Sequence, residues 1–165
     1  MTPSRSLVKV RNTRNLEQLG TVLVDLIGFL NSPQRDHALL KEAGVSLDRA
    51  LFPLLVALGA HGVLGVVEMA DLMGRDYTTI SRQLAKLESL ALVERCDAET
   101  DRRKRTARLT NDGRRIVRAI TLARQRLLSR VLVGWSESDR TALADINRRF
   151  VDALVGYAQR RQERA

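Results

Sequence analysis

Cysteine and long apolar runs are scarce in this sequence of 165 residues. The single cysteine, Cys96, excludes an intramolecular disulfide and fits a reducing compartment. No apolar run approaches the roughly 18 residues that a membrane-spanning helix needs, and the polar N-terminus does not resemble a signal peptide. We therefore expect a cytoplasmic protein that does not enter a membrane.

Residues that could form a catalytic or metal site are also missing. His37 and His61 are far apart and have no Cys or His neighbour at ligand spacing, so each is expected on the surface or in packing. We find no paired carboxylates, Ser/His/Asp set or glycine-rich phosphate loop. Cys96 falls on a predicted strand, where a small strand residue is favoured over a redox switch. The sequence therefore predicts no enzyme, no metal and no cofactor.

Acidic residues are too few to balance the basic ones. Lys and Arg number 28 against 19 Asp and Glu, which gives a formal net charge of +9 and a pI near 10.9. The excess gathers in one stretch of the sequence, at Arg102, Arg103, Lys104, Arg105, Arg108, Arg114, Arg115 and Arg118. A basic surface of this kind attracts polyanions through counterion release. An anionic membrane would need a large apolar face beside these arginines, which the sequence lacks. The charge therefore favours a polyanion, such as double-stranded DNA, over a membrane surface as the partner.

Residues 66–89 have the pattern of two short helices joined by a glycine turn. The first helix, Val66–Met73, has the small residue Ala70 where a second helix must pack closely. Gly74 follows it, and glycine adopts a left-handed turn conformation without a Cβ penalty. Asp76 is then a good N-cap for the second helix, because its carboxylate can accept backbone N–H bonds. This order predicts a helix-turn-helix.

The second helix has an apolar back and a polar front. Ile80, Leu84 and Leu87 recur at i, i+4 and i+7, which predicts a stripe that packs against the domain. Its polar and cationic residues are Thr78, Thr79, Ser81, Arg82, Gln83 and Lys86. Such side chains can bond phosphates, or bases through bidentate contacts from Arg and Gln. Arg82 could read guanine, bind a phosphate or pair with Glu88. A polar helix face alone is usually only solvated, but with the basic hairpin that follows it predicts DNA binding.

That hairpin is expected from two short strands. One strand covers Leu92–Cys96, with Val93 as its apolar anchor. The other covers Thr106–Leu109, where alternation places Ala107 and Leu109 on one face. The loop between the strands is too polar for a core, and such a basic tip can reach along DNA and insert an arginine into the minor groove. A solvated loop held by internal ion pairs is the other interpretation, and the two are compatible.

The segment from about Leu54 to Gly113 resembles the winged helix-turn-helix domain of the MarR family of bacterial transcriptional regulators. The resemblance rests on TTISRQLAKLESLALVER, on a D-x-R motif at Asp101 and Arg103, and on RLTNDG as an L-T-x-x-G motif. Resemblance in helix order extends over most of the chain. It implies a mainly α fold with a small β-wing, in which Asp101 orients Arg103. With Lys104 and Arg105 at the same tip, we expect the wing to contact DNA.

The resemblance also implies a mode of action. Members of the family act as homodimers on pseudo-palindromic operators and regulate transcription, most often by repression. Two recognition helices would enter successive major grooves about one helical turn apart, and the wings would reach the flanking minor grooves. Family members commonly respond to a small aromatic or anionic effector. The sequence identifies neither that ligand nor its site.

Two residues depart from the expected pattern. Ala91 stands where the family often has glycine, at the end of the recognition helix, and it costs little only if the turn there needs no positive φ. Pro53 falls inside a helix that we expect over Leu47–Gly59, where proline would remove a hydrogen bond and kink the helix.

The two ends of the chain carry helices with narrow apolar seams. The first helix is expected over Asn12–Leu30 and the last after Ser136, while Pro33, Thr110 and Gly134 mark helix ends between them. The seams consist of Leu16, Leu19, Leu23, Leu26 and Leu30, and of Leu143, Ile146, Phe150, Leu154 and Tyr157. One small winged domain cannot bury them all, so we expect an isologous dimer. The expected domains are 1–46 and 113–165 for dimerisation and 47–112 for DNA binding.

Two alternatives from other classes remain. An architectural DNA-binding protein that is indifferent to sequence would share the charge and the wing. A protein-interaction module that had lost DNA binding should have acidic or apolar residues on the recognition face. The run Thr78–Lys86 is uncharged or cationic throughout and argues against the second, but it does not exclude the first.

Overall fold

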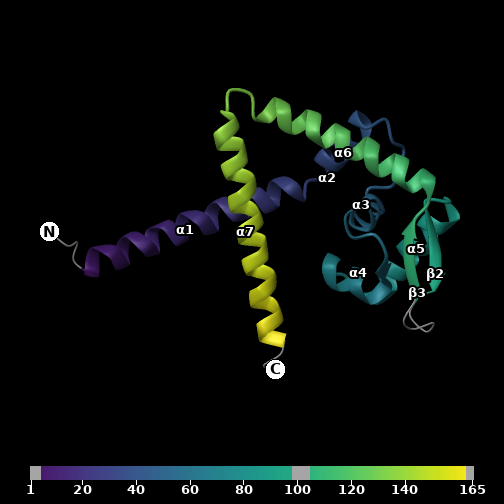
Figure 1. Ribbon diagram of the computed structural model, residues 1–165, viewed down its shortest axis with the longest axis horizontal. Helices are drawn as coiled ribbons and strands as arrows, with labels where there is room; N and C mark the ends of the chain where they lie inside the picture. The colour runs from purple at the N-terminus through teal and green to yellow at the C-terminus, as the bar shows by residue number, and fades with distance from the viewer. Residues whose placement is uncertain (1–4, 98–104, 163–165) are drawn as a thin grey trace. The chain divides into compact units, whose positions relative to one another are not determined.

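The computed structural model describes residues 5–97 and 105–162, with side chains described from 15 to 96 and from 106 to 161. Its elements are α1 (Arg5–Leu30), α2 (Pro33–Glu42), α3 (Phe52–His61), β1 (Leu64–Gly65), α4 (Val66–Met73), α5 (Tyr77–Ser89), β2 (Val93–Asp97), β3 (Arg105–Leu109), α6 (Asn111–Val131) and α7 (Glu137–Gln162). The chain divides into two compact units, Met1–Ala123 and Arg124–Ala165. The mainly helical fold with a small antiparallel sheet (Figure 1) is the one that the sequence predicts.

A proline starts α2 where the sequence predicts a break. α1 ends at Leu30, and Ser32 takes an extended N-cap conformation before Pro33, at the first turn of the new helix. Arg35 ties the two helices together. Its Nη1 donates to the carbonyl oxygen of Phe29 at 2.7 Å, and its guanidinium lies 3.3 Å from the centroid of the Phe29 ring. Proline is tolerated in the first turn because its missing N–H would have no helical partner there. The ends of the two helices confirm the predicted break.

α3 differs from its predicted extent. The helix begins at Phe52 instead of Leu47 and ends at His61. Pro53 therefore lies in the first turn, where it removes no helical hydrogen bond. The prediction of a helix from Leu47 was wrong, because proline is tolerated at the start of a helix and here marks that start.

The turn between α4 and α5 has the predicted chemistry. Gly74 has φ +59°, and its N–H and that of Arg75 donate to carbonyl oxygens of α4 at 3.2 and 3.0 Å. This is the Schellman pattern of bonds, which needs a left-handed residue at the helix end. Asp76 then caps α5, since its Oδ1 accepts the N–H of Thr79 at 2.8 Å. The predictions for Gly74 and Asp76 are both confirmed.

The end of α5 has the same pattern with alanine in place of glycine. Ala91 has φ +56°, the only positive φ at a non-glycine residue among those described. Its N–H donates to the carbonyl oxygen of Glu88 at 2.9 Å, and that of Leu92 donates to Leu87 at 3.0 Å. The turn therefore needs the left-handed conformation, and alanine is strained there.

The three strands form an antiparallel sheet in the order β1-β3-β2. The wing consists of β2, β3 and residues 98–104 between them. Val93 pairs with Leu109 across the hairpin, and both are buried together with Ala107, so the predicted alternation is confirmed. β1 has two residues and pairs with β3. No pattern in the sequence predicts this short strand.

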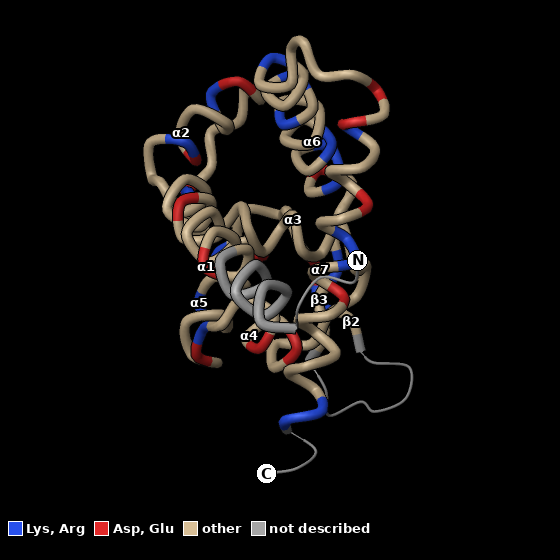
Figure 2. Tube along the Cα trace, turned by 90° about the vertical axis from the view of Figure 1, so that its left-hand side faces the viewer, with Lys and Arg blue, Asp and Glu red and all other residues tan. Residues whose placement is uncertain are grey.

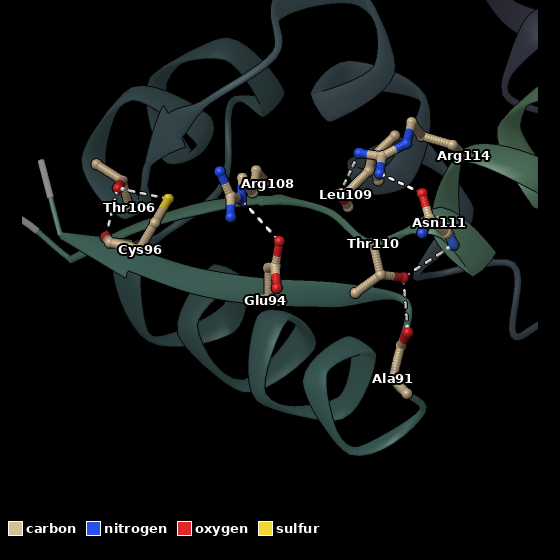
Figure 3. Close-up of polar contacts among 10 residues, drawn as sticks. Ala91, Glu94, Cys96, Thr106, Arg108, Leu109, Thr110, Asn111 and Arg114 are labelled. Atoms are coloured by element: carbon tan, nitrogen blue, oxygen red, sulfur yellow. Dashed lines mark hydrogen bonds and ion pairs between the residues drawn. The ribbon is translucent and has the colours of Figure 1, made fainter.

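The L-T-x-x-G motif joins the wing to α6 (Figure 3). The Thr110 hydroxyl donates to the carbonyl oxygen of Ala91 at 2.7 Å and accepts the N–H of Gly113 at 3.1 Å. The N–H of Thr110 donates to the carbonyl oxygen of Leu92 at 3.1 Å. A Cβ on Gly113 would collide with that same carbonyl oxygen, so glycine is required. The motif thus holds the end of α5, the wing and the start of α6 together.

One apolar core lies beneath the helix-turn-helix and the wing. Its buried residues are Leu51, Leu54, Leu55, Leu58, Val66, Met69, Ala70, Ile80, Leu84, Leu87, Leu92, Val93, Ala107 and Leu109. The predicted stripe of α5 belongs to it, with Ile80 and Leu87 0% exposed and Leu84 2% exposed. A smaller cluster joins α2, α3 and α6 through Leu40, Phe52 and Ile120. The back of α5 is thus fixed in the core, which leaves its front on the surface.

Candidate nucleic-acid interface

The front of α5 is an exposed face, which we call the reading face and define by Thr78, Arg82, Ala85, Lys86 and Ser89. All of these residues are exposed, and helical spacing places them opposite the buried stripe. Thr78, Arg82 and Lys86 follow one another at i+4 intervals and are therefore neighbours. α5 also contacts β2 of the wing (Figure 1). The fold thus presents one stripe of hydroxyls and cations beside the wing.

Arg82 is available for a partner. Glu88, the carboxylate that spacing could assign to it, is bound instead by Arg95 of β2, whose Nε donates to Glu88 Oε2 at 2.9 Å. Within the described residues, neither Arg82 nor Lys86 has a side-chain hydrogen bond or ion pair. These two cations of the reading face are therefore not neutralised by a described acid.

Thr79 belongs to the N-cap of α5. Its hydroxyl donates to Asp76 Oδ2 at 2.6 Å, and its N–H donates to Asp76 Oδ1 at 2.8 Å. The hydrogen bond from the Thr79 hydroxyl lowers the pKa of Asp76 most, and the bond from the Thr79 N–H lowers it further, because both stabilise the charged carboxylate. The pKa therefore lies below its ordinary value of 3.8. Thr79 is half-buried. Its side chain orders the first turn of the helix and lies off the reading face.

Ser81 and Gln83 flank the reading face, and both are half-buried. Gln83 Oε1 accepts a hydrogen bond from Arg75 Nη1 at 3.2 Å. Arg75 lies in the turn between α4 and α5 and is not among the site residues that the sequence predicts. The bond joins two elements across eight positions of sequence, so no local pattern indicates it.

Cross-strand contacts hold the described part of the wing (Figure 3). Arg108 Nε donates to Glu94 Oε1 at 2.7 Å. The Thr106 hydroxyl donates to the carbonyl oxygen of Cys96 at 2.6 Å, with Cys96 Sγ 3.2 Å from the same hydroxyl oxygen. Cys96 is half-buried, so it has the environment expected of a small strand residue.

The tip of the wing falls outside the described residues. This applies to Asp101, Arg103 and Lys104, and for Arg105 the backbone alone is described, in β3. Contact between these residues and DNA stays a prediction.

Arginines continue from the wing into α6, where Figure 2 shows basic residues along the helix. Arg114 Nη1 donates to the carbonyl oxygen of Leu109 at 2.8 Å, and its Nη2 donates to Asn111 Oδ1 at 2.5 Å. Arg118, one turn further on, is exposed. Arg114 therefore stabilises the junction between the wing and α6.

Two further features are absent from the described ranges. No group of His, Cys, Asp or Glu side chains there is arranged so that it could hold a metal ion. No helix there is both long enough and apolar enough to span a bilayer.

Known proteins resemble this chain in sequence and in structure. The HVO_A0114 family model matches residues 47–115. YxaD of Bacillus subtilis strain 168, an uncharacterized HTH-type transcriptional regulator, is 28% identical over 110 residues, which cover 67% of this chain and 77% of YxaD. A MarR family protein from Bacillus stearothermophilus superposes with a TM-score of 0.73 at 24% identity, over 87% of this chain and 97% of that one.

A further solved structure, of BpsR from Bordetella bronchiseptica, concerns the regulation of its DNA binding by 6-hydroxynicotinic acid. It is 25% identical, has a TM-score of 0.58, and covers 82% of this chain and 94% of BpsR. These relatives are transcriptional regulators rather than enzymes, as the sequence predicts. The helix-turn-helix, the wing and the L-T-x-x-G junction agree with these comparisons: the chain has the winged helix-turn-helix fold of MarR family proteins and is similar in sequence to an HTH-type transcriptional regulator.

Proposed function

We propose that this protein is a MarR-type transcriptional regulator, a cytoplasmic homodimer that binds a pseudo-palindromic operator with sequence specificity and represses transcription. The observation that carries the proposal is the reading face. Arg82 is exposed and has no side-chain partner among the described residues, because Arg95 holds Glu88. A guanidinium with free donors can make a bidentate contact to guanine, worth about 1–3 kcal/mol of discrimination.

Two parts of each protomer would contact DNA in this proposal. The reading face enters the major groove, and the wing reaches the flanking minor groove. The proposed contacts are Thr78, Ser81, Arg82 and Lys86 of α5 and Arg103, Lys104 and Arg105 of the wing, with Asp101 orienting Arg103. Thr79 and Gln83 are engaged within the protein, and we assign them to support of this face.

Exposed apolar side chains support the dimer. In α1, Leu16 is 62% and Leu30 61% exposed, and in α7, Ile146 is 62% and Tyr157 59% exposed. Rows of large apolar side chains in water mark surfaces that a partner covers. We infer that both helices belong to an isologous interface between two copies of the chain. Two reading faces related by a two-fold axis would then require a palindromic site.

Release from DNA by a small molecule completes the proposal. BpsR supports it, since 6-hydroxynicotinic acid regulates the DNA binding of that protein. A ligand can act in this way only if it binds one spacing of the two DNA-binding parts more tightly than another. A small aromatic acid is the class that we propose, without a site. Titration of the operator complex with 6-hydroxynicotinic acid and other aromatic acids should release DNA, and a complex that none of them affects would contradict this step.

Selection of bound fragments from genomic DNA, followed by footprinting, tests the function as a whole. We expect one motif with inverted half-sites whose centres lie about 34–36 Å apart, one helical turn. Affinity for that motif should exceed affinity for a scrambled duplex by at least about 10³-fold at physiological salt. Adding the protein should lower transcription from a promoter that contains the motif. Fragments that share no motif would favour the sequence-indifferent architectural function instead.

A further inference from the structure

Arg75 is an exposed arginine whose backbone and side chain are both held. Its N–H donates to the carbonyl oxygen of Ala70 at 3.0 Å, directly after the left-handed Gly74. Its Nη1 donates to Gln83 Oε1 at 3.2 Å. A long cationic side chain normally loses rotamer freedom when it binds a ligand. Because Arg75 is already ordered, part of that entropy cost is met before any ligand arrives.

The other donors of this guanidinium are open. Among the described residues, the bond to Gln83 is the one hydrogen bond of the Arg75 side chain, and no carboxylate forms an ion pair with it. The nearest acids in sequence are Asp71 and Asp76. Both carboxylate oxygens of Asp76 accept hydrogen bonds from Thr79 instead. The guanidinium therefore presents a positive charge and a fork of N–H groups, the arrangement that matches phosphate oxygens.

Gln83 is poorly placed to read a base. It is half-buried and follows Arg82 by one position, so helical geometry turns it to the flank of the reading face. A bidentate contact to adenine needs the amide oxygen as the acceptor for the adenine amino group. In this chain that oxygen already accepts from Arg75. The amide is better suited to hold the arginine.

We propose that Arg75 binds a phosphodiester of the DNA backbone and that Gln83 is its positioning residue. The proposal rests on the proposed function, because it requires α5 to enter the major groove. In that docking the start of the recognition helix faces base edges, while the helix before it crosses the backbone. The turn that joins them then lies at the rim of the groove, beside phosphates. The contact carries no base information and fixes the register of the reading face.

The salt dependence of binding tests this assignment. The affinity falls as salt rises, and each phosphate contact that is lost reduces the magnitude of the slope of log affinity against log salt by about 0.9. A homodimer carries Arg75 twice. In Arg75→Ala the magnitude of the slope should therefore decrease by about 1.8. Affinities for the selected operator and for a scrambled duplex should fall by similar factors, on the order of tenfold. Arg75→Lys keeps a cation and should restore most of the slope.

A double-mutant cycle tests the role of Gln83. Gln83→Ala should weaken binding to both duplexes less than Arg75→Ala does, and the double variant should bind like Arg75→Ala alone, because both residues act through one contact. Arg49→Ala is the charge-matched control. Arg49 is exposed in the segment before α3, and its loss should leave the slope unchanged. Thermal melting followed by circular dichroism verifies that each variant is folded.

An unchanged slope in Arg75→Ala would overturn the phosphate assignment. A loss in Gln83→Ala that is confined to the operator and adds to that of Arg75→Ala would make Gln83 a base reader and overturn its positioning role. Neither result decides whether the parent protein prefers its operator to a scrambled duplex. The proposed function fails instead if the parent protein binds operator and scrambled duplex equally. In that case the salt dependence of binding by the parent and by Arg75→Ala can still be compared on either duplex.

Discussion

Ala91 is the residue at which local strain is clearest. Its φ of +56° is imposed by the two N–H bonds that end α5 and by the Thr110 hydroxyl on its carbonyl oxygen. A left-handed L-residue costs roughly 1–2 kcal/mol, and the greater freedom of glycine in the unfolded chain offsets part of any gain. We predict that Ala91→Gly raises the free energy of unfolding by about 0.5–1 kcal/mol.

Urea unfolding of both proteins at one protein concentration measures this change. Gly74→Ala is the matched control, because Gly74 ends α4 with φ +59° and a Cβ there would meet no atom within 4 Å. That substitution adds backbone strain alone and should destabilise the protein by about 1 kcal/mol. An Ala91→Gly variant no more stable than the parent would show that the strain is relieved elsewhere.

Residues with a strong local preference are the ones whose roles the sequence predicts. Gly74, Asp76 and Thr110 each act through their own backbone or side-chain chemistry. Ala91 differs, because its conformation depends on a hydrogen bond from a residue 19 positions away. Its departure from the glycine common in the family is the one sign of strain that the sequence offers.

At the scale of an element, the start of α5 depends on one carboxylate. The Thr79 bonds hold the pKa of Asp76 below 3.8. A carboxyl group whose pKa is lowered on folding stabilises the folded state above its unfolded pKa, and that contribution is lost as the pH falls through the folded pKa. Asp76→Asn keeps a capping oxygen without the charge. We predict that the stability advantage of the parent over Asp76→Asn shrinks as the pH is lowered from about 6 to about 3.

Thermal unfolding of the two proteins across this pH range measures the difference. Asp71→Asn serves as the control, because the exposed Asp71 carboxylate has no side-chain hydrogen bond among the described residues. The control should lack the trend. A difference between parent and Asp76→Asn that is constant, or that grows in acid, would remove the charged cap from the explanation of the helix start.

Element boundaries are predictable where a residue type marks them. Pro33 and Thr110 mark the starts of α2 and α6, and both starts are observed. The start of α3 is missed because its apolar pattern continues back to Leu47, and Pro53 can be accommodated at the helix start as well as within a kink. β1 is missed because two residues have no measurable period.

At the scale of the whole molecule, the exposed apolar side chains of α7 support the proposed dimer. Leu143, Ile146, Leu154 and Tyr157 share one face of α7 by helical spacing, and each is 40–62% exposed. We predict that Leu154→Glu converts a dimer to a monomer with little operator affinity, because it would bury an unpaired charge in the interface. Gln159→Glu adds the same charge on the opposite face of the helix and should stay dimeric.

Sedimentation of the parent and both variants at micromolar concentration decides this. If Leu154→Glu sediments as a dimer, the interface does not use this face of α7. If the parent itself is monomeric, the homodimer proposal is wrong.

The candidate site is predictable as far as helical spacing extends. Exposed positions for Thr78, Arg82 and Lys86 follow from the period of the buried stripe. Contacts between elements do not follow from spacing. The bond from Arg95 to Glu88 and the bond from Arg75 to Gln83 both need the folded backbone. These contacts decide which polar side chains stay free for the proposed contact with DNA.

Base reading by Arg82 is the central feature of the proposed mechanism. Its most direct test is the ratio of affinities for the selected operator and a scrambled duplex, measured at one salt concentration for the parent, Arg82→Ala and Arg49→Ala. We predict a parent ratio of at least about 10³. The ratio should fall by at least about tenfold in Arg82→Ala and stay unchanged in Arg49→Ala, because guanine contacts are lost only on the operator. If Arg82→Ala loses equal affinity for both duplexes, or if the parent does not prefer the operator, base reading by Arg82 is contradicted.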